Sequence, residues 1–292
     1  MREPAPFDRI AILGTGLIGA SFGFAVQNVF PDVSITAFDR DSVLEHVAGR
    51  GLHWKVTKDA RAAVSGAELI YIALPVGVAI DLMAQISVSC DSGALVTDAG
   101  STKTAVCRAA SMQFKGGAQF LGGHPVAGKE LSGFEHATAE LFRGTRYVLI
   151  GNEDEVNDRA RKFQELVRAI GAEPVWCDAE THDWALAVVS QMPQLAAVAL
   201  ARVIADETDE TGLPLSLAGR GLRDLLRIAG SPYEVWQDIC LTNTENIART
   251  LDRLAQAIEF LRSHLADKDL LDEFRASNEV YKSLHGTGTG RE

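Results

Sequence analysis

The sequence predicts an α/β protein in two parts, a doubly wound parallel sheet over residues 1–178 and an all-helical domain over residues 179–292. In the first part, short apolar segments alternate with helical segments up to Cys177. Repeated β-α units of this length form a parallel sheet with helices on both faces. After Cys177 the strand-like segments stop, and apolar residues recur at helical spacing almost to the C-terminus.

The strands of the first part read as short apolar runs, which are typical of strands buried on both faces. We expect a helix at 157–170, with Gly171 as its C′ stop, and one more strand before Cys177. Other helices are expected between the strands, for example at 76–87 and 102–114. The expected strands are 9–14, 33–39, 67–74, 93–100, 118–125 and 145–151.

The second part is predicted to begin near 178–181, where "DAETHD" offers capping residues for a new helix. Pro193 lies inside the first helical segment and is expected to kink it. The segments with periodic apolar residues are 180–207, 216–230, 233–265 and 269–284.

Composition and charge narrow the classes of function. The chain has 292 residues and a net charge of −11, which argues against a nucleic-acid partner because binding a phosphate backbone needs a basic face. The four cysteines are scattered without C-x-x-C spacing, so we expect reduced thiols and no metal site. No apolar run reads as a membrane span and no signal-peptide core is visible at the N-terminus, so a cytoplasmic protein without a membrane partner is expected.

A glycine motif follows the first strand directly. Gly14, Gly16 and Gly19 form G-x-G-x-x-G at the start of a helix, and Asp39 ends the second strand twenty residues after Gly19. This context is typical of a Rossmann-type domain, in which the glycines admit a pyrophosphate and the acid accepts the ribose hydroxyls of NAD. Arg40 could instead meet the 2′-phosphate of NADP, but Asp39 would repel that phosphate, so NAD is favoured. The expected cofactor-binding residues are Gly14, Gly16, Leu17, Ile18, Gly19, Asp39 and Arg40.

Two polar residues follow strands that end at the same edge of the sheet, where ligands of open α/β sheets bind. His124 stands in "GGHPVAGKELSG", where Pro125 favours an extended backbone. A neutral imidazole there could accept a hydroxyl proton while hydride leaves a substrate, or the segment could be a turn with an incidental histidine. Ser101 in "DAGSTK" could bond to the imidazole or the nicotinamide, or it could cap the next helix.

Taken with "GTGLIGAS" upstream, "DAGSTK" before it and "RDLLRIAGSPYEVWQDICLTN" after it, the His124 segment resembles the prephenate/arogenate dehydrogenase family. The resemblance runs from residue 9 to about 250. It implies a Rossmann-type domain followed by a helical domain that forms a homodimer. It also implies the NAD(P)-dependent oxidation and decarboxylation of a cyclohexadienol, prephenate or arogenate, to an aromatic product in tyrosine biosynthesis.

The resemblance also implies residue roles. His124 matches the catalytic histidine, Ser101 the serine that bonds to it, and Glu130 a gating carboxylate. Arg227 matches the arginine that pairs with a substrate carboxylate, although a solvated helix face is the alternative from sequence alone. Asp224 and His182 fit the same pattern near the substrate.

One segment departs from the family pattern. Many members have Ser-His-x-Pro-His where this chain reads "SQMPQ" at 190–194. Gln191 and Gln194 replace both histidines, and Gln194 is expected at the substrate as a neutral amide that could serve either prephenate or arogenate. Two other functions stay open, another two-domain dehydrogenase of hydroxy or imino acids, and a cofactor-binding protein with an altered site.

Overall fold

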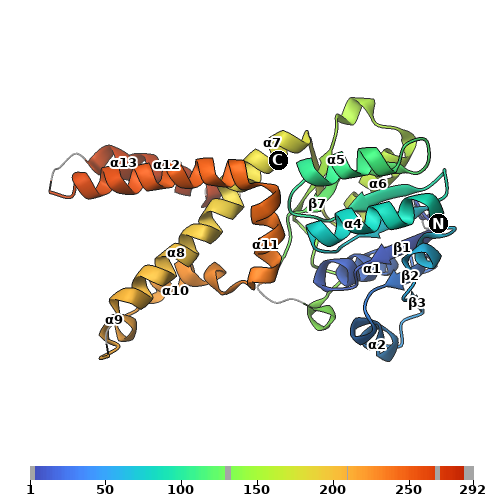
Figure 1. Cartoon of the computed structure of the whole chain (residues 1–292), viewed down its shortest axis with the longest axis horizontal. Helices are drawn as coiled ribbons and strands as arrows, with labels where there is room; N and C mark the ends of the chain where they lie inside the picture. Colours follow the sequence, from blue (N-terminus) through green and yellow to red (C-terminus); the bar gives the residue numbers. More distant parts are fainter. Residues whose placement is uncertain (1–3, 129–132, 209, 267–269, 286–292) are drawn as a thin grey trace, which may run out of the picture.

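A computed structural model describes residues 4–128, 133–208, 210–266 and 270–285 of the chain (Figure 1). Its main sheet has six parallel strands in the order β3-β2-β1-β4-β5-β6. The strands are β1 (Arg9–Leu13), β2 (Ser34–Phe38), β3 (Lys55–Thr57), β4 (Leu69–Ile72), β5 (Leu95–Asp98) and β6 (Gln119–Leu121). The predicted fold class is confirmed, and β3 is a strand that the sequence pattern did not reveal.

Helices cover both faces of this sheet and enclose two apolar clusters, one on each side. The central strands β4 and β5 are buried along their full length, as their continuous apolar runs predict. The helices between the strands are α1 (Leu17–Val29), α2 (Asp41–Gly49), α3 (Ala60–Val64), α4 (Val76–Ile86) and α5 (Thr104–Gln113).

A second sheet holds β7 (Gly123–Pro125), β8 (Arg146–Ile150) and β9 (Glu173–Cys177), with β7 antiparallel to β8 and β8 parallel to β9. The expectation of one strand over 118–125 is therefore wrong, because the chain leaves the main sheet at Gly122. A Cβ at Gly123 would lie 2.7 Å from the backbone oxygen of Asp98, so glycine lets the chain cross β5 closely. Helix α6 (Asp158–Ala169) precedes β9 and ends before Gly171, which has φ +90° as predicted for a C′ residue.

After β9 the described chain is helical. Asp178 caps the next helix by accepting a hydrogen bond of 2.8 Å from the Thr181 amide. A π-helical turn, η4 (Ala187–Gln191), interrupts the first long segment just before Pro193, whose missing N–H breaks the regular ladder. The elements are α7 (Ala179–Leu186), η4, α8 (Met192–Glu207), α9 (Leu213–Ser216), α10 (Arg220–Leu226), η5 (Ile228–Gly230), α11 (Tyr233–Thr242), α12 (Thr244–Ser263) and α13 (Leu271–His285).

Two helical arms diverge from the sheet region, one formed by α8, α9 and α10 and the other by α12 and α13 (Figure 1). Large apolar side chains on both arms are exposed, among them Leu217 on the first and Phe274 on the second. Helix α13 contains no buried residue. The arms therefore present apolar surface that this chain alone does not cover.

One helical run, from Ala179 to Glu207, is long and apolar enough to cross a bilayer when judged by length and composition alone. The expectation that no segment meets this criterion is therefore wrong. The same run carries the buried polar side chains of His182, Asp183, Gln191 and Gln194, and all four hydrogen-bond to other side chains or backbone of the protein. These hydrogen bonds attach the run to the rest of the protein, although only 22% of its most apolar window is buried within this single chain.

Candidate active site

The glycine turn after β1 has the geometry that a dinucleotide requires. Gly14 has φ +94°, and a Cβ there would lie 2.4 Å from the Ala73 carbonyl oxygen. A Cβ on Gly19 would lie 1.9 Å from the Gly14 oxygen, so this glycine lets α1 approach the turn. A Cβ on Gly16 would meet no protein atom within 4 Å, which leaves open space at the N-terminus of α1. Together these features fit a bound pyrophosphate.

The neighbours of the turn complete this part of the site. The first amides of α1, including those of Leu17 and Ile18, have no intrahelical acceptor and can point at a phosphate. One carboxylate oxygen of Asp39 accepts hydrogen bonds from the Thr15 amide (2.6 Å) and the Thr15 hydroxyl (3.1 Å). The side chain of Asp39 is thus held beside the glycine turn, at the end of β2, and Arg40 is exposed next to it.

His124 lies on β7 and is one end of a buried hydrogen-bonded chain. Its Nδ1 is 2.9 Å from Nε2 of His182, and Nδ1 of His182 is 2.8 Å from a carboxylate oxygen of Asp183. All three residues are less than 10% exposed. Because both ring nitrogens of His182 are engaged within the protein, neither is available to a substrate.

This chain fixes the tautomers when both imidazoles are neutral. Burial alone would raise the pKa of Asp183, but hydrogen bonds from His182, Thr104 and Lys103 outweigh it and lower that pKa. An ionised carboxylate only accepts, so Nδ1 of His182 carries the proton and its Nε2 accepts one from His124. The Nε2 of His124 is then left with a free lone pair, as a base requires.

A buried ion pair lies next to His124. The Lys103 ammonium is fully buried, pairs with the carboxylate of Asp98 and donates a 2.8 Å hydrogen bond to the Gly123 carbonyl. Burial, His182 and the positive charge of Lys103 together hold the pKa of His124 well below its usual value. The imidazole is therefore neutral at physiological pH.

Asp183 also caps α5, the helix that follows the "DAGSTK" loop. Its two carboxylate oxygens accept hydrogen bonds from the amides of Lys103 (2.7 Å) and Thr104 (2.9 Å). Ser101 therefore does not fill the capping role that the sequence allowed. Among the described residues, the ring of His124 hydrogen-bonds to His182 and not to Ser101, so the expected serine contact is absent in this state.

Each glutamine of "SQMPQ" is hydrogen-bonded to another part of the helical domain. Asn243 donates hydrogen bonds of 2.7 Å to the Asp183 carbonyl and to the Gln191 side chain. Gln194 donates a 2.9 Å hydrogen bond to the carbonyl of Ile228, the residue after Arg227. The structure thus places Gln194 beside the segment that carries Arg227.

Of the other predicted substrate residues, two are exposed and one lies outside the described residues. Arg227 directly follows α10 and is exposed, and Asp224 lies exposed on α10 three residues earlier. Glu130 falls outside the described residues, so its expected gating role has no structural counterpart here.

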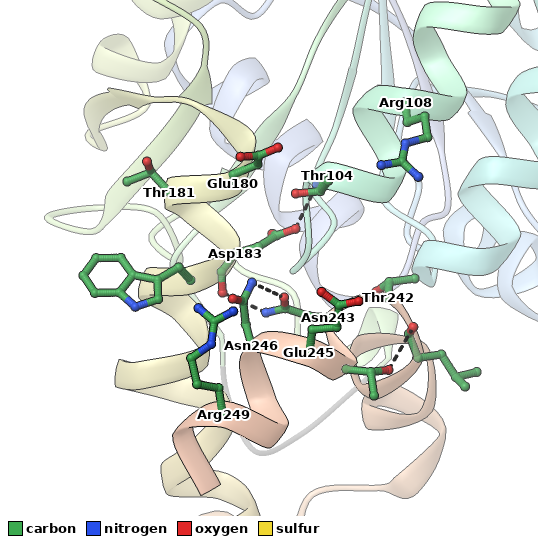
Figure 2. Close-up of a pocket in the computed structure, with 13 residues that line it drawn as sticks. Thr104, Arg108, Glu180, Thr181, Asp183, Thr242, Asn243, Glu245, Asn246 and Arg249 are labelled. Carbon is green, nitrogen blue, oxygen red and sulfur yellow. Dashed lines mark hydrogen bonds between the residues drawn. The ribbon is translucent and has the colours of Figure 1, made fainter. Parts of the chain in front are cut away.

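A cavity of about 850 Å³ lies between α5, α7 and the junction of α11 and α12 (Figure 2). Asp183 and Asn243 line it, and Figure 2 shows them bonded to each other and to neighbouring residues. None of the glycine turn, Asp39 and His124 belongs to its lining. We therefore take the candidate site to lie at the carboxyl ends of the strands, where the glycine turn follows β1 and His124 follows β6, and not in this cavity.

Sequence reasoning missed Lys103, Asp98 and Asp183. All three stood in motifs already singled out, with Asp98 and Lys103 inside "TDAGSTK" and Asp183 next to His182. The visible signal was two opposite charges at the end of an apolar strand, where an unpaired charge would be costly. No group of three or more His, Cys, Asp or Glu side chains that could hold a metal occurs among the residues described.

Comparisons with known proteins agree with this geometry. The model of the prephenate dehydrogenase nucleotide-binding domain matches residues 22–175, and that of the prephenate dehydrogenase dimerization domain matches residues 178–277. The chain is 33% identical over 259 residues to prephenate dehydrogenase of Lactococcus lactis, covering 88% of this chain and 69% of that protein. It is 28% identical to cyclohexadienyl dehydrogenase of Zymomonas mobilis, covering 95% of this chain and 96% of that protein.

Solved structures give the same fold. Prephenate dehydrogenase from Aquifex aeolicus, in a complex with hydroxyphenyl propionate and NAD+, superposes with a TM-score of 0.86 at 22% identity, covering 95% of this chain and 98% of that one. Synechocystis arogenate dehydrogenase superposes with a TM-score of 0.78 at 25% identity, covering 95% of this chain and 99% of that one.

A glycine turn built for a pyrophosphate, a neutral buried histidine and an appended helical domain define a dinucleotide-dependent dehydrogenase. The two family models match consecutive parts of the chain, the nucleotide-binding domain first and the dimerization domain second. The chain belongs to the prephenate dehydrogenase family.

Proposed function

We propose that this protein catalyses the NAD-dependent oxidative decarboxylation of a cyclohexadienol, prephenate or arogenate, to the aromatic product in tyrosine biosynthesis. The observation that carries the proposal is the chain from Asp183 through His182 to His124, which leaves Nε2 of a neutral imidazole as an acceptor. A base of this kind suits the removal of a hydroxyl proton.

Bound at the glycine turn, NAD supplies the hydride acceptor. Nε2 of His124 takes the proton from the oxygen of the ring hydroxyl as hydride leaves the carbon that bears this hydroxyl. The C–C bond to the ring carboxylate then breaks, CO₂ leaves, and the electron pair of that bond makes the ring aromatic as a phenolate, which takes the proton back from Nε2 of His124. While His124 holds the proton, its positive charge lies one hydrogen bond from His182 and two from the Asp183 carboxylate, which stabilises it.

The substrate roles extend the resemblance to named residues. Arg227 binds a substrate carboxylate, because its planar guanidinium takes a carboxylate through two hydrogen bonds. Asp224 lies near that subsite in the proposal, Glu130 keeps the gating role that the resemblance implies, and Ser101 bonds to the substrate hydroxyl or the nicotinamide once both are present. Gln194 acts through the segment of Arg227, to which it is bonded.

His182 receives a different role from the one expected. Its position between His124 and Asp183 makes it a positioning residue, which sets the tautomer of the base. Asp39 accepts the ribose hydroxyls of NAD, whereas Arg40 is the feature that would favour NADP.

The proposal also covers organisation. We place the boundary between a dinucleotide-binding domain (1–178) and a helical substrate and dimerisation domain (179–292) at Asp178, which caps α7. A homodimer is supported by the match to a dimerization domain and by the exposed apolar arms. A cytoplasmic location without membrane or nucleic-acid partners accords with the acidic composition and the biosynthetic reaction.

The direct test is the formation of reduced nicotinamide, followed by absorbance, with prephenate and arogenate, each paired with NAD and NADP. We expect turnover with NAD and release of CO₂ in equal amounts with reduced cofactor. Asp39→Ala should lower the preference for NAD over NADP, because the acid that bonds to the 2′-hydroxyl is lost. Failure of the purified protein to oxidise either substrate with either cofactor would reject the proposed function.

A further inference from the structure

Helix α11 binds the sheet region at two points on one face. The Gly77 amide, in the first turn of α4, donates a 2.8 Å hydrogen bond to the carboxylate of Asp238. One turn further along α11, the hydroxyls of Thr242 and Thr102 are 2.7 Å apart. The two helices α4 and α11 are in contact, and α11 stands against the sheet region in Figure 1.

The direction of the second bond follows from its neighbours. The Thr242 hydroxyl already donates a 2.6 Å hydrogen bond to the Asp238 carbonyl within α11. A hydroxyl has only one hydrogen, so Thr242 must accept from Thr102. In both hydrogen bonds the donor therefore belongs to the sheet region and the acceptor to α11.

The local sequence makes the first point specific. Pro75 precedes α4 and has no side-chain acceptor, so the helix cannot cap itself there. A Cβ on Gly77 would lie 3.1 Å from Asp238 Oδ2, which is tighter than an ordinary contact. Glycine thus lets the carboxylate of a distant helix reach this amide.

The two points border the nicotinamide half of the dinucleotide crevice. Asp39 follows β2, on one side of β1, and the glycine turn follows β1 itself. A dinucleotide with its adenosine over β2 extends its other half over β4 and β5, where residues 75–77 and 100–102 lie.

Ser101 lies between two residues that are held by hydrogen bonds. On its N-terminal side, the Gly100 amide donates a 2.9 Å hydrogen bond to Asp98. On its C-terminal side, the buried side chain of Thr102 is bonded to Thr242. The position of Ser101 therefore depends on a contact from the helical domain.

We propose that Asp238 and Thr242 are positioning residues that hold the helical domain against the start of α4 (residues 75–77) and the loop 100–102, and so keep Ser101 and the nicotinamide aligned with the side chains that bind the substrate. This inference rests on the proposed function, because the alignment matters only if hydride passes from a substrate bound by the helical domain to a dinucleotide bound by the sheet region. Misplacement of reacting groups by about 1 Å can reduce a rate by about 10²-fold.

The first test compares Asp238→Ala with Asp238→Asn, which keeps an acceptor for the Gly77 amide. We expect Asp238→Ala to lower kcat by about 10- to 100-fold with little change in the Kd of NAD, because the glycine turn and Asp39 are untouched. Asp238→Asn should restore most of the rate. Gln237→Ala, at an exposed neighbour on α11, is the matched control and should keep the parental rate.

A double-mutant cycle separates this positioning role from general destabilisation. Gly77→Ala alone should lower kcat, because its Cβ displaces the carboxylate of Asp238. In the Asp238→Ala background the same change should cost nothing further, since the crowded partner is gone. A parental kcat in folded Asp238→Ala, or additive effects in the cycle, would overturn the proposal.

A last measurement does not depend on turnover. Hydrogen exchange of the amides at 100–104 should accelerate in Thr242→Val and stay parental in Thr242→Ser, with NAD bound in each case. Unchanged exchange in Thr242→Val would refute the positioning role even if the enzyme oxidises its substrate. Faster exchange in an enzyme with no turnover would instead place the fault in the proposed function.

Discussion

The protonation state of His124 depends on groups from three segments that are far apart in the sequence. His124 itself is buried on β7, His182 comes from α7, and the Lys103 ammonium comes from the loop before α5. All three causes act in the same direction and lower its pKa. Since only the neutral ring can accept a proton, the base stays competent at pH values below the usual titration range of histidine.

The pH profile tests this assignment. We expect kcat/KM to rise with pH through an ionisation that lies below about 6.5, the ordinary histidine value. His124→Asn should lose that limb and lower kcat by roughly 10²–10⁴-fold, with NAD binding unchanged because His124 is no part of the glycine turn. An acid limb at or above the ordinary value, or a parental kcat in the variant, would contradict the assignment of His124 as the base.

Lys103 offers a related prediction. Lys103→Met removes the positive charge nearest to the imidazole pair, so the pKa of His124 should rise and the acid limb should move to higher pH. The same change leaves the buried carboxylate of Asp98 unpaired and should lower the melting temperature. The profile is therefore measured well below that temperature, and Lys162→Met, on the exposed side of α6, is the control. An unmoved limb would exclude Lys103 as a cause of the lowered pKa.

At the scale of elements, the three glycines of the turn have different roles, although all three are glycine positions of the same motif. Gly14 and Gly19 are required by the protein itself, because a Cβ on either would strike backbone atoms. Gly16 faces open space, so its small size matters only for a ligand. The motif predicted all three, but only the packed structure separates the folding requirement from the binding requirement.

This difference is measurable. Gly16→Ala should keep the parental melting temperature and weaken NAD binding by roughly ten- to hundredfold, since crowding a tight contact costs about 1–3 kcal/mol. Gly19→Ala should lower the free energy of unfolding, because α1 can no longer approach the turn. Calorimetry for stability and fluorescence titration for NAD give both quantities. Equal effects of the two changes on stability would show that this division is incorrect.

The sequence predicted elements whose signal is local. Apolar runs identified most strands of the main sheet, and Asn157 with Gly171 marked both ends of α6. The split of 118–125 between two sheets was not predictable in this way, because it depends on how closely Gly123 crosses β5. The same limit hid the hydrogen bond between His182 on α7 and His124 on β7, which are 58 residues apart in the sequence. Local patterns therefore predicted His124, and the resemblance added His182, but neither identified Lys103 or Asp183.

At the scale of the whole molecule, the two parts of the chain differ in how they are stabilised. The sheet region buries two extensive apolar clusters, whereas the described helical part has a small cluster of Ala187, Ile239 and Ile247. Helix α13 carries exposed Leu271, Phe274 and Tyr281. Ordering such an arm needs apolar contacts beyond those within one chain, and a second copy supplies them in the proposed dimer.

Phe274→Glu tests the dimer through the arm that depends on it most. Phe274 is 65% exposed in the single chain, and its burial between two copies would make a charge there costly. We expect the variant to shift from dimer to monomer in light scattering over a concentration series, with the melting temperature becoming lower. Val88→Glu is the matched control, because Val88 is 82% exposed on the sheet region, away from both arms. A Phe274→Glu protein that stays dimeric at the same concentrations as the control would mean that α13 lies outside the interface and that its apolar side chains have another partner.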